Sequence, residues 1–194
     1  MVNLYGNELL KSCYQPTVGF TTGIFAQINL KNHLSLRTNI SYERKGSEYN
    51  SEVYFEPQTS PEGNIVRLIG HLKFNYLTMP ILIQLSIGKK VNYFANVGPY
   101  WGYLFSVVSV WEESKSFSGG KETHTNSFKR FDLGISSGLG VSVPIKEHLL
   151  IVIELRNNIG LFDVRKPSAY VTLITKTIST NLLVGLSYKL SKGN

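Results

Sequence analysis

Few side chains in this sequence have the types and spacing that catalysis requires. In the tripeptide His33-Leu34-Ser35, a base and a hydroxyl share one face if the segment is a strand. Such a pair would suit a membrane-embedded lipid hydrolase. The alternation of the surrounding residues turns this face toward a protein interior and away from lipid, which argues against that activity. A second pairing, in "HTNS" (124–127), falls in an expected loop.

No metal or cofactor site is predicted. The histidines, His33, His71, His124 and His148, are far apart and lack metal-ligand spacing. The single cysteine, Cys13, excludes an internal disulfide and a cysteine-based zinc cluster. Glycine-rich phosphate loops, HExxH and GxSxG are absent. We therefore expect no cofactor, no resident metal and no catalytic activity.

Four charged residues fall on the polar side of alternating segments: Arg37, Glu43, Glu154 and Arg156. If that side faces a closed interior, the charges must be paired, because an unpaired buried charge is costly. We predict an interior polar network of ion pairs and hydrogen bonds that contains these four residues. A proton or ion path is the functional alternative, and a small filled interior disfavours it.

The elements that must position these residues are strands. In "FDLGISSGLGVSVPI" (131–145) one parity is apolar and the other is small and polar. Such alternation is typical of a strand with two different environments on its faces. Similar alternation occurs in six further segments, each about ten residues or longer: 18–30, 33–45, 76–88, 91–108, 147–158 and 177–190.

The connections between these strands alternate in length. The short ones are 31–32, 88–90 and 144–147; the long ones are 46–70, 109–127 and 157–176. This order is typical of an up-and-down transmembrane barrel with short periplasmic turns and long outer loops. We predict an all-β, antiparallel up-and-down transmembrane β-barrel that forms a single domain over residues 1–194.

Bacterial single-chain barrels have an even number of strands. Seven long strands, with a long loop expected over residues 5–17, therefore predict an eighth strand before them, of which "MVNLY" would be the end. On this hypothesis the full protein has eight strands, and most of strand one and a signal peptide lie upstream of Met1. The alternative is that Met1 is the natural start.

Aromatic residues are expected where lipid headgroups meet water. Tyr93 and Tyr188 fall near the short-turn end of their strands, whereas Tyr42, Trp111 and Phe131 fall near the long-loop end. We predict that these five residues belong to two membrane-interface belts. Aromatic residues also favour strands in general, which is the alternative explanation.

The net charge of +7 is spread along the chain without a run of five basic residues, which argues against nucleic-acid binding. The short turns carry Lys31, Lys89, Lys90 and Lys146, which would either meet anionic phosphates or simply be solvated. The expected partners are outer-membrane lipid or lipopolysaccharide, and an envelope protein that the outer loops would contact.

Five motifs resemble a known family: "GFTTGIFAQINL", "YLTMPILIQLSIG", "FANVGPYWGYLF", "FDLGISSGLGV" and "ELRNNIGL". In order and spacing they resemble the PorT-type outer membrane β-barrel family of Bacteroidota, over about residues 18 to 190. The resemblance implies an eight-stranded barrel in the outer membrane and a cleaved signal peptide. The namesake is linked to secretion and gliding machinery, but most members have no assigned activity, so that role is not carried over.

The sequence therefore favours a non-enzymatic outer-membrane barrel with a structural or adhesive role, or one accessory to an envelope complex. A soluble calyx that binds an apolar ligand is a further alternative, in which the apolar parity would point inward. Gly134, Gly138 and Gly140 argue against it, because a calyx needs an apolar lining.

Overall fold

The computed structural model describes residues 2–5, 14–55, 64–112, 119–167 and 174–190, with side chains from Thr17 to Glu48 and from Gly70 onward within these ranges. The described residues form ten strands and one short 3-10 turn, η1 (Thr125–Ser127). The strands are β1 (Val2–Tyr5), β2 (Tyr14–Pro16), β3 (Thr21–Asn29), β4 (Leu34–Phe55), β5 (Asn64–Ile87), β6 (Asn92–Trp111), β7 (Gly120–Thr123), β8 (Phe131–Pro144), β9 (Leu149–Gly160) and β10 (Ile174–Tyr188).

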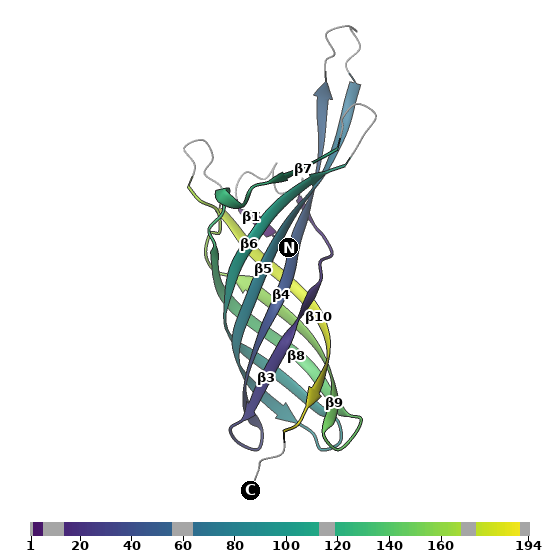
Figure 1. Cartoon of the computed structure of the whole chain (residues 1–194), viewed down its shortest axis with the longest axis vertical. Coiled ribbons are helices and arrows are strands. Elements are labelled where there is room, and N and C mark those ends of the chain that lie inside the picture. The colour runs from purple at the N-terminus through teal and green to yellow at the C-terminus, as the bar shows by residue number, and fades with distance from the viewer. Residues whose placement is uncertain (1, 6–13, 56–63, 113–118, 168–173, 191–194) are drawn as a thin grey trace.

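The strands form one antiparallel sheet that curls into a barrel (Figure 1). Its order is β1-β10-β9-β8-β6-β5-β4, with β2 and β3 both paired to β4 and β7 paired to the upper part of β6. Each long strand therefore pairs with its sequence neighbours, which confirms the predicted up-and-down β-barrel. Among the described residues, no helix is long and apolar enough to cross a membrane.

The first and last strands meet at one seam of the barrel. β1 runs antiparallel to the upper part of β10, with Val2 opposite Thr177. Below this point β10 and β3 run in the same direction, and no backbone ladder joins their described residues. A side-chain hydrogen bond links them, because Thr21 Oγ1 donates to Asn181 Oδ1 at 3.0 Å.

The connections differ in length at the two ends of the barrel. At the turn end, β3, β5 and β8 each pass to the next long strand through four residues, whereas the long connections lie at the opposite, outer end (Figure 1). The predicted loop 46–70 is largely wrong, since β4 and β5 stay paired up to Phe55 and Asn64. Alternation weakens there because neither face of this extension has to meet lipid.

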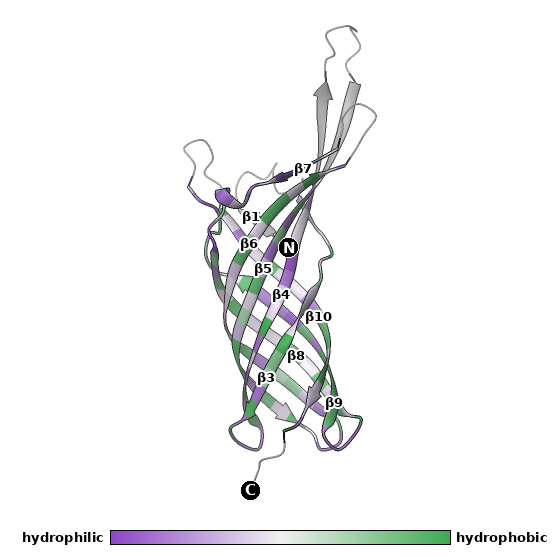
Figure 2. Cartoon of the chain, viewed as in Figure 1, coloured by the Kyte–Doolittle hydropathy of each residue, from purple (hydrophilic) through white to green (hydrophobic). Residues whose placement is uncertain are grey.

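The small polar face of residues 131–145 lies inside the barrel. Along β8, Leu139 is 67% exposed on the outer surface, whereas Gly134 and Gly140 point inward. A side chain at these glycines would collide with the rings of Tyr100 and Phe94 respectively, so the glycines make room for inward aromatic rings. Figure 2 shows the same alternation of apolar and polar residues along the strands.

Candidate functional site

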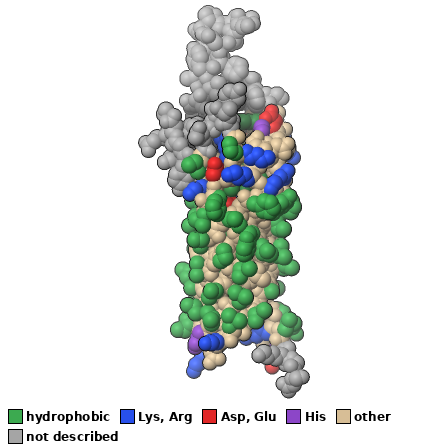
Figure 3. All heavy atoms as spheres, turned by 90° about the vertical axis from the view of Figure 1, so that its left-hand side faces the viewer, with side chains coloured by type: hydrophobic (Ala, Val, Ile, Leu, Met, Phe, Trp, Pro, Cys, Tyr) green, Lys and Arg blue, Asp and Glu red, His purple; other side chains and the backbone are tan. Residues whose placement is uncertain are grey.

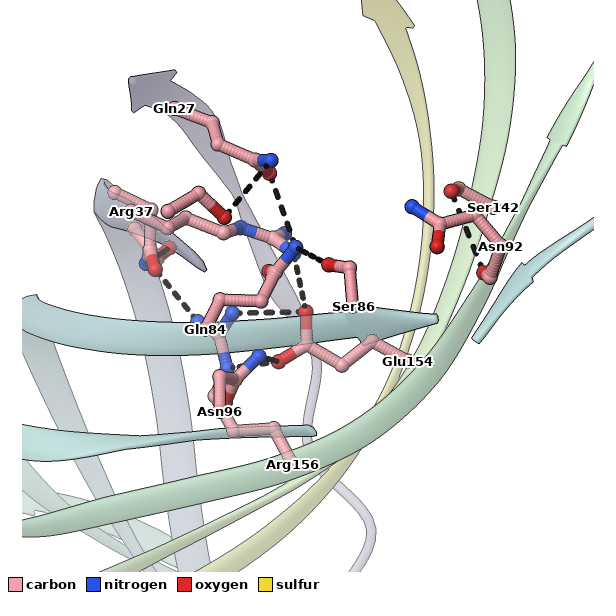
Figure 4. A network of polar contacts seen from close by, with 12 residues as sticks. Gln27, Arg37, Gln84, Ser86, Asn92, Asn96, Ser142, Glu154 and Arg156 are labelled. Atoms are coloured by element: carbon pink, nitrogen blue, oxygen red, sulfur yellow. Dashed lines mark hydrogen bonds and ion pairs between the residues drawn. The ribbon is translucent and has the colours of Figure 1, made fainter. Parts of the chain in front are cut away.

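The lower half of the barrel interior contains a cluster centred on Glu154, which is fully buried. Arg37 Nη1 lies 3.0 Å from Glu154 Oε2, and Arg156 Nε donates to Oε1 at 2.8 Å while Nη2 donates to Oε2 at 2.9 Å. Asn96 Nδ2 also donates to Oε1, at 3.0 Å. Figure 4 shows the carboxylate between the two guanidinium groups. One carboxylate thus contacts two cations, and the three charges come from two strands: Arg37 lies on β4, and Glu154 and Arg156 lie on β9.

The two arginines are held by further contacts that fix their positions. Arg156 Nη1 donates to Asn39 Oδ1 at 2.6 Å, and the Arg37 guanidinium lies over the ring of Phe25, 4.3 Å from its centroid. Arg37 Nη1 also lies 3.5 Å from Gln84 Oε1. Amide oxygens and an aromatic face therefore disperse the second positive charge that Glu154 alone does not balance.

A second cluster lies nearer the outer end and has the opposite balance of charge. The Lys45 ammonium is 3.6 Å from Glu43 Oε2 and 3.9 Å from Asp132 Oδ2. Tyr100 Oη donates to Asp132 Oδ2 at 3.0 Å, and Thr177 Oγ1 donates to the same oxygen at 2.5 Å. Two carboxylates thus share one buried cation; hydroxyl groups also donate to Asp132, and the Asn181 amide donates to Glu43 Oε1 at 2.9 Å.

The four residues predicted as one interior polar network all lie inside the barrel, but in two clusters. Arg37, Glu154 and Arg156 belong to the lower cluster, whereas Glu43 belongs to the upper one. Asp132 was not among the predicted members. It lies on the inward face of residues 131–145, and a carboxylate on a face of small residues is the signal that could have identified it.

The outer mouth of the barrel is closed by a hydrophobic cluster. Phe74, Leu104 and Val107 pack with Phe128 and Val164, all of them buried. Phe128 and Val164 belong to two connections at the outer end. These connections are joined by a hydrogen bond from the Lys129 N–H to the Val164 carbonyl at 2.7 Å. The cluster thus fills the interior near the outer end with apolar side chains.

The outer surface of the barrel wall is an apolar band (Figure 3). Exposed aliphatic side chains cover it, including Ile83, Leu139, Leu155, Leu182 and Val184. A polar interior with an apolar exterior is the reverse of what a soluble calyx needs, so that alternative is not supported. The apolar face of the opening motif is the face that lipid would cover.

Aromatic side chains border this band. Tyr93 and Tyr188 are exposed near the turn end, and Phe131 is exposed where β8 begins at the outer end. Tyr42 also faces outward there and donates from its hydroxyl to Asn75 Oδ1 at 2.6 Å. This distribution agrees with two belts at membrane depth.

Trp111 is placed differently from the other four predicted interface aromatics. It lies six residues beyond Phe105 along β6, which corresponds to roughly 20 Å of strand. There it pairs with Gly70, and its ring occupies the space that a side chain at that glycine would need. The structure thus does not group Trp111 with the aromatic residues that border the apolar band.

The His33–Ser35 pair is not assembled as a catalytic dyad. The His33 ring is at the exposed turn end, with Nδ1 3.1 Å from the Ser86 carbonyl oxygen. Ser35 is buried inside the barrel, and its hydroxyl accepts a hydrogen bond from Gln27 Nε2 at 3.2 Å. Within the described ranges, no group of three or more histidine, cysteine, aspartate or glutamate side chains is arranged to hold a metal. Cys13 lies outside the described residues.

The position of the apolar band predicts how much an outward-facing charged side chain lowers the free energy of unfolding. The loss should depend on how deep in the bilayer that side chain lies. Leu139→Arg, in the middle of β8, should lower the free energy of unfolding in lipid by about 2–4 kcal/mol, because it places a cation near the centre of the bilayer. Ile145→Arg, at the turn end, should cost only about 0–1 kcal/mol. Urea unfolding in vesicles measures both values, and equal costs would contradict this placement.

A family model for the outer membrane protein beta-barrel domain matches residues 6–166, most of the chain. Two crystal structures of Ail, the attachment invasion locus protein of Yersinia pestis, are similar over 88% of this chain and 93% of theirs, at 13% identity. One holds the heparin analogue sucrose octasulfate. The TM-scores are 0.31 and 0.30, so this likeness carries no inference about ligands. No curated protein matches the chain.

The family match agrees with the architecture built up above: an antiparallel up-and-down barrel, an apolar outer band and a polar filled interior. Long connections at one end and short turns at the other complete the pattern of an outer-membrane barrel. The chain belongs to the outer membrane protein beta-barrel domain family, and its place is the cell outer membrane.

Proposed function

We propose that this protein is a non-enzymatic barrel that acts at the cell surface through its outer end. Its role is structural or adhesive, or it is accessory to a larger envelope complex, and lipopolysaccharide surrounds its outer rim. The proposal includes membership of the PorT-type barrels of Bacteroidota, which the five sequence motifs support, without the secretion and gliding role of the namesake. The observation that carries this proposal is the hairpin that β4 and β5 form above the barrel.

This hairpin extends beyond every neighbouring strand (Figure 1). Pairing of β2 with β4 ends at Tyr49, and pairing of β5 with β6 ends at Gly70. Six further residue pairs join β4 and β5, from Asn50–Ile69 to Phe55–Asn64. Over these six pairs, the edge of each strand that faces away from the hairpin partner has no paired strand among the described residues. Its backbone N–H and C=O groups could therefore pair with a strand of a partner protein.

The rest of the outer end supports a surface role and argues against transport. The buried cluster of Phe74, Phe128 and Val164 lies at the mouth, and charged groups paired with one another lie in the interior below it. A barrel of this size has an interior filled by side chains. An isolated hairpin is only marginally stable in water, whereas this one continues a ladder that the barrel holds in place.

A hairpin-shortened variant tests this function. Residues 50–69 are replaced by Asn-Gly, which forms a tight two-residue turn between the paired residues Tyr49 and Gly70. We expect the variant to reach the outer membrane and to keep a mobility that changes on boiling, since the barrel wall is untouched. Adhesion of the cells to surfaces, or the size of the native envelope complex that contains the barrel, should fall to the level of a deletion strain.

The matched control replaces residues 113–118, in another outer connection, by a Gly-Ser segment of the same length. It should keep both adhesion and complex size. If the hairpin-shortened barrel also keeps both, the hairpin is not the functional element and the proposal is wrong.

A further inference from the structure

We propose that one face of the outer rim binds the phosphate groups of lipopolysaccharide through an outer basic cluster. The cluster consists of Lys129, Arg130, Arg165, Lys166 and Lys176. The inference deepens the proposed function, because it rests on lipopolysaccharide surrounding the rim, but it does not depend on the β4–β5 hairpin.

The fold brings the five cations together from three separate segments. The Lys129 N–H donates to the Val164 carbonyl at 2.7 Å, and the Lys166 N–H donates to the Ser127 carbonyl at 3.0 Å. The Val164 N–H in turn donates to the Thr175 carbonyl at 2.9 Å. Backbone hydrogen bonds thus hold three segments side by side: residues 127–130, 163–166 and 174–176. We call these three segments the platform. Their backbone contacts set the positions of the basic residues.

Neutral groups orient two cations of the cluster, Lys129 and Arg130. Lys129 Nζ donates to the Asp163 carbonyl oxygen at 2.9 Å. Arg130 Nη1 donates to the carbonyl oxygens of Leu104 and Phe105, at 3.1 and 2.9 Å. Among the described residues, neither Lys129 nor Arg130 forms an ion pair with a carboxylate. The contacts with carbonyl oxygens thus order both side chains without a carboxylate partner among the described residues.

Asp163 is the one acidic residue in the three segments, and its carboxylate accepts hydrogen bonds from backbone N–H groups. Its Oδ1 accepts hydrogen bonds from the N–H groups of Arg165, at 3.0 Å, and Thr175, at 2.8 Å. By formal charge, the three segments carry five basic side chains and one acidic side chain, which sum to +4. A surface of this charge, exposed at Lys129, Arg130 and Lys166, attracts polyanions.

The position of the cluster, just above the apolar band, favours a membrane lipid over a free anion as its ligand. Arg130 directly precedes Phe131, which is 70% exposed at the upper border of the apolar band, and Phe162 is exposed beside the second segment. Figure 3 shows lysine and arginine side chains in a row above the hydrophobic band. Cations at this level meet the phosphates of lipids whose acyl chains cover the band below. The lipid of the outer leaflet, lipopolysaccharide, carries phosphates on its sugar headgroup.

The test compares three probes on the refolded full chain in detergent: bisphosphorylated lipopolysaccharide, the same lipid after enzymatic dephosphorylation, and inorganic phosphate. For the variant K129Q/R130Q/K166Q, we expect the affinity for phosphorylated lipopolysaccharide to fall by about tenfold or more at low salt, since each lost cation removes an attraction to the lipid phosphates. Dephosphorylated lipid should bind the wild-type barrel as weakly as phosphorylated lipid binds the variant.

Two controls separate the cluster from general charge and from misfolding. K31Q/K89Q/K90Q removes the same charge from the turn end and should keep wild-type affinity. K129R/K166R keeps the charge and should also bind as the wild type does. Because Arg130 contacts the backbone, each variant is first checked for a mobility that changes on boiling, and K129Q/K166Q replaces the triple variant if that variant fails to fold.

Unchanged binding by a folded glutamine variant would overturn the proposal, as would equal binding of dephosphorylated lipid. Displacement of the lipid by millimolar inorganic phosphate would show that a free anion is the ligand, and that the membrane lipid is not. The hairpin-shortened barrel should keep its lipopolysaccharide affinity. Loss of adhesion and loss of lipid binding can therefore be observed separately.

Discussion

Glu154→Ala should lower the free energy of unfolding of the barrel by about 3–5 kcal/mol, the cost of leaving buried charges without their partner. The carboxylate contacts Arg37 and Arg156 at 3.0 Å or less, and all three side chains are almost completely buried. Alanine would leave two like charges facing one another in an interior that water reaches poorly. Glu154 therefore has a larger predicted effect than any outward-facing residue.

Urea titration of the detergent-refolded protein measures this loss, and the band that shifts on boiling gives the folded fraction. Glu147→Ala, on the exposed turn before β9, is the matched control and should change the free energy by less than about 0.5 kcal/mol. The triple variant R37M/E154L/R156M removes the charges together and should recover most of the loss. A cost below about 1 kcal/mol for Glu154→Ala would mean that the arginines are stabilised without it.

The strands, and which side of each strand faces outward, could be predicted from the sequence. Every second side chain of a membrane-spanning strand faces lipid, so it has to be apolar. The apolar parity of residues 131–145 is the outer one, as Leu139 and Leu133 show. The same rule failed above the membrane. There the pairs from Asn50–Ile69 to Phe55–Asn64 continue the ladder, so that part of the predicted loop 46–70 is strand.

The partners of the interior charges could not be predicted from alternation. Parity shows that a side chain points inward, but its height in the barrel depends on the register of every strand between it and its partner. Glu43 is six residues above Arg37 on β4, and this offset is enough to place it with Lys45 and Asp132. Register is a property of the closed sheet, and the hydropathy of one strand does not contain it.

A bulge explains the different position of Trp111. On β6, Ser106 pairs with Asn75 and Leu104 pairs with Tyr76, so Phe105 is the extra residue. Above it the parity reverses, and Val107 is buried although Phe105 is exposed. The bulge therefore changes the direction in which residues above it face, whereas the height of Trp111 follows from β6 itself, which continues past residue 108, the predicted strand end.

Gly134→Ala should destabilise the barrel by about 1–3 kcal/mol or more, because it adds a methyl group where the interior is already filled. A Cβ at this position would collide with the carbonyl oxygen of Ile159 and would lie 2.5 Å from Tyr100 Cε1. The carbonyl belongs to the β8–β9 ladder, so it cannot withdraw without loss of strand pairing. The ring cannot withdraw freely either, since the Tyr100 hydroxyl donates to Asp132.

Gly185→Ala in β10 is the matched control, because its nearest neighbour would be Phe25 Cε1 at 3.7 Å, an ordinary contact. This control should be neutral or stabilising by about 0.5–1 kcal/mol, since alanine costs less entropy than glycine in a strand. Tyr100→Ala combined with Gly134→Ala should recover only part of the loss, as the Ile159 carbonyl still obstructs the methyl group. Equal stability of the two single variants would contradict the tight packing of β8 against the inward rings. Full recovery in the double variant would assign the whole obstruction to Tyr100, and the backbone of β9 would then have to be able to yield.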